Sequence, residues 1–291
     1  MDIKELKKEK TNQDDNEIIL NKYRHHPLIK DLNLTDKELK EYLGVIAHII
    51  KKKESYETSN HNNAFFYTQL IRNIHGKLEV ISVPNEKTYE WLNIRNHYLI
   101  RNFPDSHLKI LMNHESIGKI SVSKKNVLDE YRKILNNPNK ARGIYVYGKV
   151  GVGKTYTSIA LANEFAKRNF NVAFVNCAEI GYKLKLGFDL PNSVNDEIVD
   201  KMKESDVLFL DDIGAEDEKI WFYNNYLLIT LNYRMDRNKL TFFTSNLNIE
   251  SFYKKLSNLM HKSFNAERLI ERIKALTHNQ EIEITGSNQR Y

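Results

Sequence analysis

Glycine, lysine and threonine residues between positions 148 and 155 have the spacing of a phosphate-binding loop. The segment that fits the pattern G-x-x-x-x-G-K-[ST] is Gly148-Lys149-Val150-Gly151-Val152-Gly153-Lys154-Thr155. Its glycines allow successive backbone N–H groups to point at phosphate oxygens. Lys154 can reach the β- and γ-phosphates, and the Thr155 hydroxyl can bind Mg²⁺. The sequence therefore predicts a nucleoside triphosphate site with Mg²⁺. A glycine-rich turn without a ligand is the alternative.

Two acids and an amide follow predicted strands further along the chain. Asp211 and Asp212 end the apolar run that begins at Val207, and Asn246 follows a second apolar run at 240–245. Asp211 is placed to hold Mg²⁺ together with Thr155, and Asp212 to orient or deprotonate an attacking water. An amide at position 246 can both donate to and accept from the γ-phosphate or the water. Taken alone, each feature is more typical of a structural turn than of a ligand site.

Arginines near the end of the chain could stabilise charge on the γ-phosphate in the transition state. Arg268 and Arg272 are four residues apart on one predicted helix face, and Arg290 follows. An arginine supplied by a neighbouring subunit would make hydrolysis depend on assembly. The alternative is ordinary surface charge, because Glu267 and Glu271 make the same helix face mixed in sign.

From position 143 onward, short apolar strands alternate with helical segments. The expected strands are 143–147, 171–176, 207–211 and 240–245, and the expected helices include 154–168, 179–186 and 219–234. This order predicts an α/β fold with a parallel sheet covered by helices on both faces. Ligands in such sheets bind at the carboxyl ends of the strands, where the phosphate loop and the acids would meet.

The first part of the chain is more irregular. Residues 1–22 are highly charged, and a capping box at Thr35 opens a helix that should run to about Lys52. Two strands at 65–74 and 78–83 complete a smaller α+β unit. A further helix is expected at 126–135. We therefore divide the chain into an N-terminal domain at 1–90, a linker region at 91–125 and an ATPase domain at 126–291.

Composition sets outer limits on the protein class. The 291 residues are 41% hydrophobic and 28% charged, which is typical of a globular protein. The net charge of +6 favours an anionic partner such as nucleic acid. Cys177 is the single cysteine, so an internal disulfide is excluded and a reducing compartment is favoured. Apolar runs stay well short of the ~18 residues of a membrane span, and residues 1–6 lack a signal-peptide core. We expect a soluble, cytoplasmic protein without a membrane partner.

The residues from Gly143 to Tyr291 resemble the ATPase domain of the bacterial helicase loaders, the DnaI/DnaC family of AAA+ proteins, and the DnaI branch in particular. Besides the phosphate loop, the matching segments are Leu-Phe-Leu-Asp-Asp-Ile-Gly-Ala-Glu, Thr-Phe-Phe-Thr-Ser-Asn-Leu, Glu-Arg-Leu-Ile-Glu-Arg-Ile-Lys-Ala-Leu and Ile-Thr-Gly-Ser-Asn-Gln-Arg. The resemblance implies an AAA+ P-loop fold, ATP with Mg²⁺ as cofactors, and ATP hydrolysis stimulated by a partner or DNA. It covers about half of the chain.

The resemblance also implies roles for single residues. Asn246 matches the sensor 1 position, Arg272 the arginine finger, and Arg290 the sensor 2 residue that would contact the nucleotide. Arg268 remains a second candidate for the finger. The family tail usually carries paired arginines where this chain has Gln289 and Arg290. Together with the phosphate loop, these residues form the predicted ATP site.

The N-terminal domain departs from the family pattern. The DnaI branch has a cysteine-bearing zinc module there that docks on the replicative helicase, whereas this chain has no cysteine before Cys177. His61 and His75 alone make a poor structural zinc site, so we predict that no zinc is bound. The resemblance implies that the N-terminal domain still binds the helicase.

A basic and aromatic segment after the second strand could contact DNA. Tyr182, Lys183 and Lys185 lie on the predicted helix 179–186 and could stack on and track single-stranded DNA. The similar region of the family contacts DNA. A solvated amphipathic helix is the alternative interpretation.

The sequence thus predicts an ATP-dependent helicase loader that binds the replicative DNA helicase, places it on single-stranded DNA and forms homo-oligomers on ATP. Three alternatives stay open. A related AAA+ ATPase could act as a transposition helper or replication initiator. A small-molecule kinase would need an acceptor site, and none is evident. A non-hydrolysing scaffold conflicts with the intact Lys154, Thr155 and Asp211.

Overall fold

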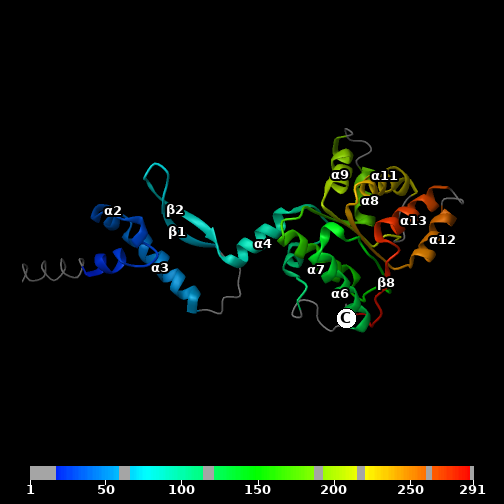
Figure 1. Cartoon of the computed structure of the whole chain (residues 1–291). Helices are drawn as coiled ribbons and strands as arrows, with labels where there is room; N and C mark the ends of the chain where they lie inside the picture. The colour runs from blue at the N-terminus through cyan, green and yellow to red at the C-terminus, as the bar shows by residue number, and fades with distance from the viewer. Residues whose placement is uncertain are drawn as a thin grey trace, which may run out of the picture. The chain divides into compact units, whose positions relative to one another are not determined.

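The chain forms two compact units, which divide between Glu90 and Trp91. The computed structural model of the protein describes residues 18–58, 66–113, 121–186, 193–214, 220–259 and 264–288 (Figure 1). The division falls within helix α4, which runs from Glu86 to Asn96.

The first unit packs helices against a two-stranded antiparallel sheet. Its elements are η1 (Lys30–Leu32), α2 (Asp36–Glu41), α3 (Leu43–Thr58), β1 (Phe66–Arg72) and β2 (Leu78–Pro84). Leu70 and Leu78 from the strands are buried with Leu39, Ile46 and Ile50 from the helices. The unit therefore has the small α+β architecture that the sequence predicts.

The predicted capping box at Thr35 is confirmed. The Glu38 N–H donates to the Thr35 hydroxyl at 3.3 Å, and the Thr35 N–H donates to the Glu38 carboxylate at 2.9 Å. The helix that follows is not continuous to Lys52, because Tyr42 leaves helical geometry and separates α2 from α3. Gly44, a poor helix former, lies just beyond this break.

The second unit is built on a six-stranded sheet in the order β3-β5-β6-β7-β4-β8, and all its strand pairs are parallel. The strands are β3 (Tyr98–Arg101), β4 (Tyr145–Tyr147), β5 (Val172–Asn176), β6 (Val207–Asp211), β7 (Leu240–Ser245) and β8 (Glu281–Glu283). The other elements are η2 (Asp105–Lys109), α6 (Val122–Asn136), η3 (Pro138–Lys140), α7 (Lys154–Lys167), α8 (Cys177–Leu186), α9 (Ser193–Glu204), α10 (Ile220–Phe222), the π-helix η5 (Tyr223–Leu227), α11 (Leu228–Asp236), α12 (Ile249–Leu259) and α13 (Phe264–Thr277). The parallel sheet predicted from the alternating pattern is confirmed.

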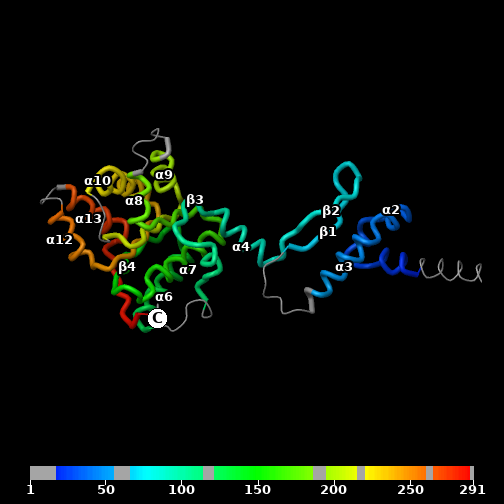
Figure 2. The backbone as a smooth tube through the Cα atoms, turned by 180° about the vertical axis from the view of Figure 1, so that it is seen from behind, coloured from blue at the N-terminus to red at the C-terminus, as the bar shows by residue number. Residues whose placement is uncertain are grey.

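Helices cover both faces of this sheet because successive strand residues point to opposite sides. Phe209 belongs to the core shared with α6 and α7, whereas Leu208 and Leu210 belong to the core shared with α8, α9, α11, α12 and α13. Helices α6 and α7 lie side by side in both views of the chain (Figures 1 and 2). Burial on both faces explains why β6 is apolar along its whole length up to Asp211.

The segment 91–125, predicted as a linker, instead contributes to the second unit. Strand β3 pairs in parallel with β5, and Tyr98 lies opposite Val172. Leu108 and Ile110 are buried in the core beneath α6 and α7. The prediction was wrong because a four-residue strand leaves too short a pattern to recognise until its partner β5 is known.

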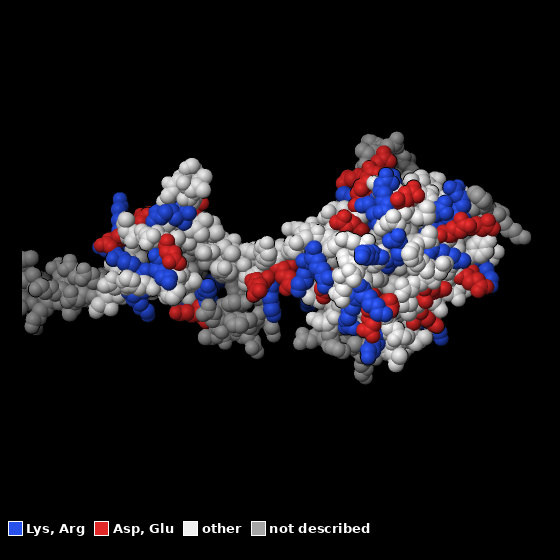
Figure 3. Space-filling model, in the orientation of Figure 1, with Lys and Arg blue, Asp and Glu red and all other residues white. Residues whose placement is uncertain are grey.

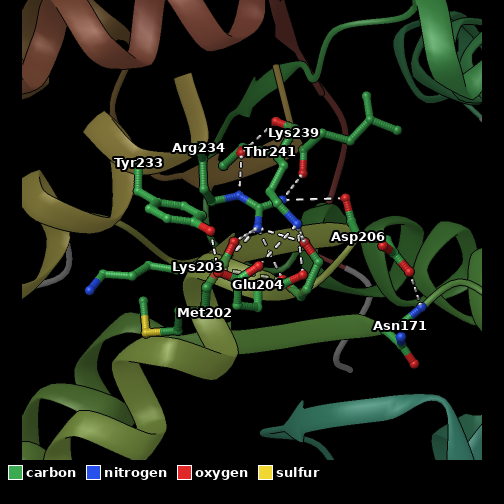
Figure 4. A network of polar contacts seen from close by, with 11 residues as sticks. Asn171, Met202, Lys203, Glu204, Asp206, Tyr233, Arg234, Lys239 and Thr241 are labelled. Carbon is green, nitrogen blue, oxygen red and sulfur yellow. Dashed lines mark hydrogen bonds and ion pairs between the residues drawn. The ribbon is translucent and has the colours of Figure 1, made fainter. Parts of the chain in front are cut away.

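A buried arginine joins α11 to the elements around it. Arg234 is fully buried, and its guanidinium donates to the carbonyls of Met202, Ser205 and Leu240 and to the Thr241 hydroxyl at 2.6–2.9 Å (Figure 4). Burial lowers its pKa to about 9, which leaves it protonated at neutral pH. The cation satisfies carbonyls at the C-terminal end of α9, where a positive charge is favoured.

We predict that Arg234→Met lowers the free energy of unfolding by about 3 kcal/mol, because several buried carbonyls lose their donor. Arg237→Met, at an exposed position on the same segment, should cost less than about 1 kcal/mol. Urea denaturation followed by circular dichroism measures both. Similar small losses in the two variants would contradict the structural role of Arg234.

Candidate nucleotide-binding site

The predicted phosphate loop connects the end of β4 to the start of α7. Gly148, Gly151 and Gly153 have φ values of 148°, 85° and 100°, a region that side chains with a Cβ rarely adopt. Gly153 caps α7, so Lys154 is the first residue of that helix. The helix N-terminus and the loop N–H groups form a concentration of positive partial charge suited to phosphate.

Close packing also requires glycine at the start of the loop. A Cβ on Gly148 would lie 2.2 Å from the carbonyl oxygen of Ile284, which follows β8. The Gly148 N–H donates to the Ser245 carbonyl at 3.2 Å. The loop is therefore held between the ends of β7 and β8.

The Lys154 ammonium is directed into the loop. It is 7% exposed and donates to the carbonyls of Gly148 and Lys149 at 2.8 and 3.0 Å. It also donates to Oδ1 of Asn246 at 2.8 Å. These bonds hold the positive charge beside the backbone that would surround the phosphates.

The Asp211 carboxylate lies beside Thr155 at the end of β6. The Thr155 hydroxyl donates to both carboxylate oxygens, at 2.9 and 3.2 Å, and the Thr244 hydroxyl donates to Oδ1 at 2.6 Å. Burial raises the pKa of Asp211 above its usual value, while the bonds from Thr244, Thr155 and Asn176 act in the opposite direction. Asp211 and Asn176 are paired across β6 and β5.

Asp212 begins the turn after β6 and is only partly buried. Its φ of 57° is left-handed, and its N–H donates to the Thr244 hydroxyl at 2.9 Å. The Asn246 amide donates to its carboxylate at 3.0 Å. The second acid is thus directed toward the same side of the sheet edge as Asn246.

These hydrogen bonds, together with the peptide bond between Lys154 and Thr155, close into one ring, which we call the polar ring. Its members are Lys154, Asn246, Asp212, Thr244, Asp211 and Thr155. The structure brings together the residues predicted for phosphate contact, metal binding, water activation and phosphate sensing. The carboxylate and hydroxyl oxygens of Asp211 and Thr155 are ligands that suit Mg²⁺, and the loop suits a nucleotide polyphosphate.

The C-terminal segment contributes contacts that the sequence analysis missed. The Ile284 N–H donates to the Tyr147 carbonyl at 2.8 Å, and Thr285 is bonded to Ser123 on α6. The side chain of Asn288 lies against Gly151, where an added Cβ would be 2.0 Å from its Oδ1. The segment thus follows the phosphate loop from its start to its outer bend.

Two of the three arginine candidates, Arg268 and Arg272, lie on α13. Arg272 on α13 donates from Nε to Oδ1 of Asn232 on α11 at 2.7 Å, and its side chain is 23% exposed. Arg268 is partly buried one turn earlier on the same helix. Arg290 lies outside the described residues. The finger and sensor 2 assignments remain predictions.

The predicted DNA-contacting residues lie on α8, which begins directly after Asn176. Tyr182 is 64% exposed, and Lys183 and Lys185 are exposed on the same helix. Lys183 forms an ion pair with Glu179 at 2.7 Å. These side chains are accessible to a ligand, and their role in DNA contact remains a prediction.

The histidines considered for zinc have different positions. His75 lies in the turn between β1 and β2, where its N–H donates to Oδ1 of Asn73 at 3.0 Å. His61 lies outside the described residues. The absence of bound zinc remains a prediction.

Sequence reasoning missed two polar residues that hold Asp211. Thr244 and Asn176 both lie at carboxyl ends of strands beside β6. The sequence feature that could identify Thr244 and Asn176 is their position at strand ends. That position becomes informative only once the strand order is known. In sequence alone, a threonine within an apolar strand is typical of ordinary strand composition.

Comparisons with known proteins agree with this geometry. A family model described as IstB-like ATP binding protein matches residues 121–291. The chain is 32% identical over 169 residues to the replicative helicase loader DnaI of Bacillus subtilis (strain 168), across 56% of this chain and 52% of that protein. It is 25% identical over 183 residues to the replicative helicase loader DnaC of Buchnera aphidicola subsp. Baizongia pistaciae (strain Bp), across 62% of this chain and 66% of that protein.

A solved crystal structure of DnaI is similar to the second unit in fold. It aligns with a TM-score of 0.58 and 30% sequence identity, covering 68% of this chain and the whole of that one. The predicted AAA+ P-loop fold is thereby confirmed. The chain spans about half to two thirds of the length of the two helicase loaders it matches.

We predict that Gly148→Ala lowers ATP affinity by about tenfold or more, because the new Cβ would collide with the Ile284 carbonyl at a backbone angle that side chains avoid. Gly44→Ala is the matched control, since a Cβ there meets nothing within 4 Å. Isothermal titration with ATP and Mg²⁺ measures both variants. If Gly148→Ala bound ATP with wild-type affinity, the nucleotide would have to bind away from this loop.

Proposed function

The chain belongs to the family of IstB-like ATP-binding proteins, and from this premise we propose that it is an ATP-dependent helicase loader. In this proposal it binds the replicative DNA helicase and places it on single-stranded DNA during replication initiation or restart. The observation that carries the proposal is the polar ring beside the phosphate loop. The fold around it is similar to the whole of the solved DnaI chain.

In this proposal, the residues of the polar ring carry out ATP hydrolysis. The Lys154 ammonium would leave its loop carbonyls to bind the β- and γ-phosphates. Asp211 and Thr155 would hold Mg²⁺, which supplies charge neutralisation at the phosphates. Asp212, directed by the Asn246 amide, would orient or deprotonate the attacking water. The exposure of Asp212 leaves it accessible to such a water.

Helicase binding is assigned to residues 1–90 in this proposal, and DNA contact to α8. On the face in view in Figure 3, Lys and Arg side chains are interspersed with Asp and Glu side chains in the described parts of the chain. DNA contact therefore rests on the exposed Tyr182, Lys183 and Lys185 rather than on the net charge. A role in DNA replication agrees with the predicted cytoplasmic location.

In the parts of the chain that the structure describes, each helix is too short or too polar to cross a lipid bilayer.

Homo-oligomer formation on ATP would bring an arginine of one subunit to the nucleotide of the next. Arg272 is the favoured finger because it matches the finger position of the helicase-loader family, and its side chain is 23% exposed. It would have to exchange the Asn232 side chain for the γ-phosphate. Such an exchange would make hydrolysis depend on assembly.

The alternative function is a related AAA+ ATPase that acts as a transposition helper or replication initiator. The family description, an IstB-like ATP-binding protein, is wider than helicase loading and leaves this alternative open. A transposition helper would bind duplex DNA and a transposase, whereas a loader binds the replicative helicase.

We predict that the wild-type protein co-purifies with the replicative helicase of its own cell, and that Lys154→Ala loses ATP-dependent recovery because it cannot bind the phosphates. Nucleotide affinity should fall by about 100-fold in this variant. Lys125→Ala, at an exposed position on α6 of the same unit, is the matched control. Recovery of a transposase without helicase would refute the loader and favour the alternative.

A second prediction separates the two candidate fingers. Arg272→Ala should leave ATP affinity within about twofold of wild type, yet reduce assembly-dependent hydrolysis by about 100-fold or more. Arg268→Ala should change hydrolysis little if Arg272 is the finger. Phosphate release, measured against protein concentration with helicase and single-stranded DNA present, compares them. If Arg272→Ala weakened ATP binding by isolated subunits as much as it reduced hydrolysis, Arg272 would not act on the nucleotide of a neighbouring subunit.

A further inference from the structure

One member of the polar ring has no role in the proposed hydrolysis. Thr244 lies next to the end of β7 and is 2% exposed, so its hydroxyl is enclosed by protein. The other five members contact phosphate, metal or water in the proposed function. Thr244 is therefore the residue whose presence in the ring requires a separate explanation.

The hydroxyl of Thr244 joins the two acids to each other. It donates to Oδ1 of Asp211 at 2.6 Å and accepts from the N–H of Asp212 at 2.9 Å. A hydroxyl has one donor and two acceptor lone pairs, so it can make both bonds at once. The two bonds fix the carboxylate of one acid and the backbone of the next relative to the same oxygen atom.

The backbone around Thr244 reinforces this link. The Ile213 N–H donates to the Thr244 carbonyl at 2.9 Å, so Thr244 by itself makes two hydrogen bonds to the turn after β6. Asp212 is held at a left-handed φ of 57°, a conformation that needs support from its surroundings. A threonine also restricts its own side-chain rotation, because it is branched at Cβ.

We propose that Thr244 is a positioning residue that aligns the metal carboxylate of Asp211 with the water-activating residue Asp212. The inference rests on the proposed ATPase site and adds a residue to it. Without the hydroxyl, the Asp211 carboxylate loses one of its fixed donors and the Asp212 turn loses its acceptor. Metal binding and the orientation of Asp212 would then fail together, while the phosphate loop remains intact.

The test compares Thr244→Val, which keeps the shape but removes the hydroxyl, with Thr244→Ser, which keeps the hydroxyl. ATP affinity is measured by titration in EDTA and again with Mg²⁺, and turnover is measured by phosphate release. Thr230→Val is the matched control, since Thr230 is fully buried and its hydroxyl bonds to the Tyr226 carbonyl of its own helix segment.

We expect Thr244→Val to bind ATP in EDTA within about twofold of wild type, because the phosphate loop is unchanged. The tightening of ATP binding by Mg²⁺ should fall by about tenfold, which raises KM for ATP with Mg²⁺ by a similar factor. In addition, kcat should fall by about tenfold or more, because Asp212 is no longer held in place. Thr244→Ser should recover both within about threefold. Thr230→Val should leave them unchanged.

The inference would be overturned if Thr244→Val kept the wild-type turnover and the wild-type increase of ATP affinity with Mg²⁺. It would also be overturned if Thr230→Val lost as much of both as Thr244→Val does. A wild-type protein whose ATP affinity does not respond to Mg²⁺ would also overturn it. Should Thr244→Val not fold, Thr244→Cys carries the same expectation, because a thiol is a weaker donor. Hydrolysis without helicase recovery would refute the proposed loader and leave the Thr244 assignment intact.

Discussion

The arrangement of the second unit depends on a buried carboxylate at the end of β6. Asp211 is 4% exposed, and a charge in that position is costly unless it is hydrogen-bonded. Its donors come from α7, β7 and β5, through Thr155, Thr244 and Asn176. One carboxylate therefore requires the phosphate-loop helix and the strands on either side of β6 to meet at the same edge. The parallel topology makes this possible, because all the carboxyl ends lie on one side of the sheet.

The same requirement connects stability to chemistry. The groups that satisfy Asp211 in the folded chain are the groups that surround a predicted Mg²⁺ site, and Lys154 is held nearby through Asn246. Arg234 plays a different part, since it stabilises the opposite end of β7 by binding carbonyls around Met202 and Leu240. Polar interactions thus anchor β7 at both ends, and only the end near Asp211 has donors and acceptors suited to nucleotide and metal.

Much of this unit could be predicted from sequence because its signals are local. The phosphate loop has a fixed spacing, and β6 is a continuous apolar run that ends in two acids. The elements that were missed depend on contacts distant in sequence. Strand β3 is recognisable only once it is paired with β5, and β8 is only three residues long and pairs with β4. The segment 284–288 packs closely against Gly148 and Gly151. Thr244 lies within the predicted strand 240–245, and its link to two acids depends on the pairing of β6 and β7. Assembly, helicase binding and DNA contact involve other molecules, so neither the sequence pattern nor the fold of one chain determines them.

In the proposed function, nucleotide binding in this unit drives the placement of a ring helicase on single-stranded DNA. The most direct measurement is unwinding by the replicative helicase on a closed circular single-stranded template with an annealed oligonucleotide, with and without this protein and ATP. The account predicts that wild-type protein with ATP increases the fraction of template unwound, and that Lys154→Ala does not. Unwinding that is unchanged by the wild-type protein, or increased equally by Lys154→Ala, would contradict it.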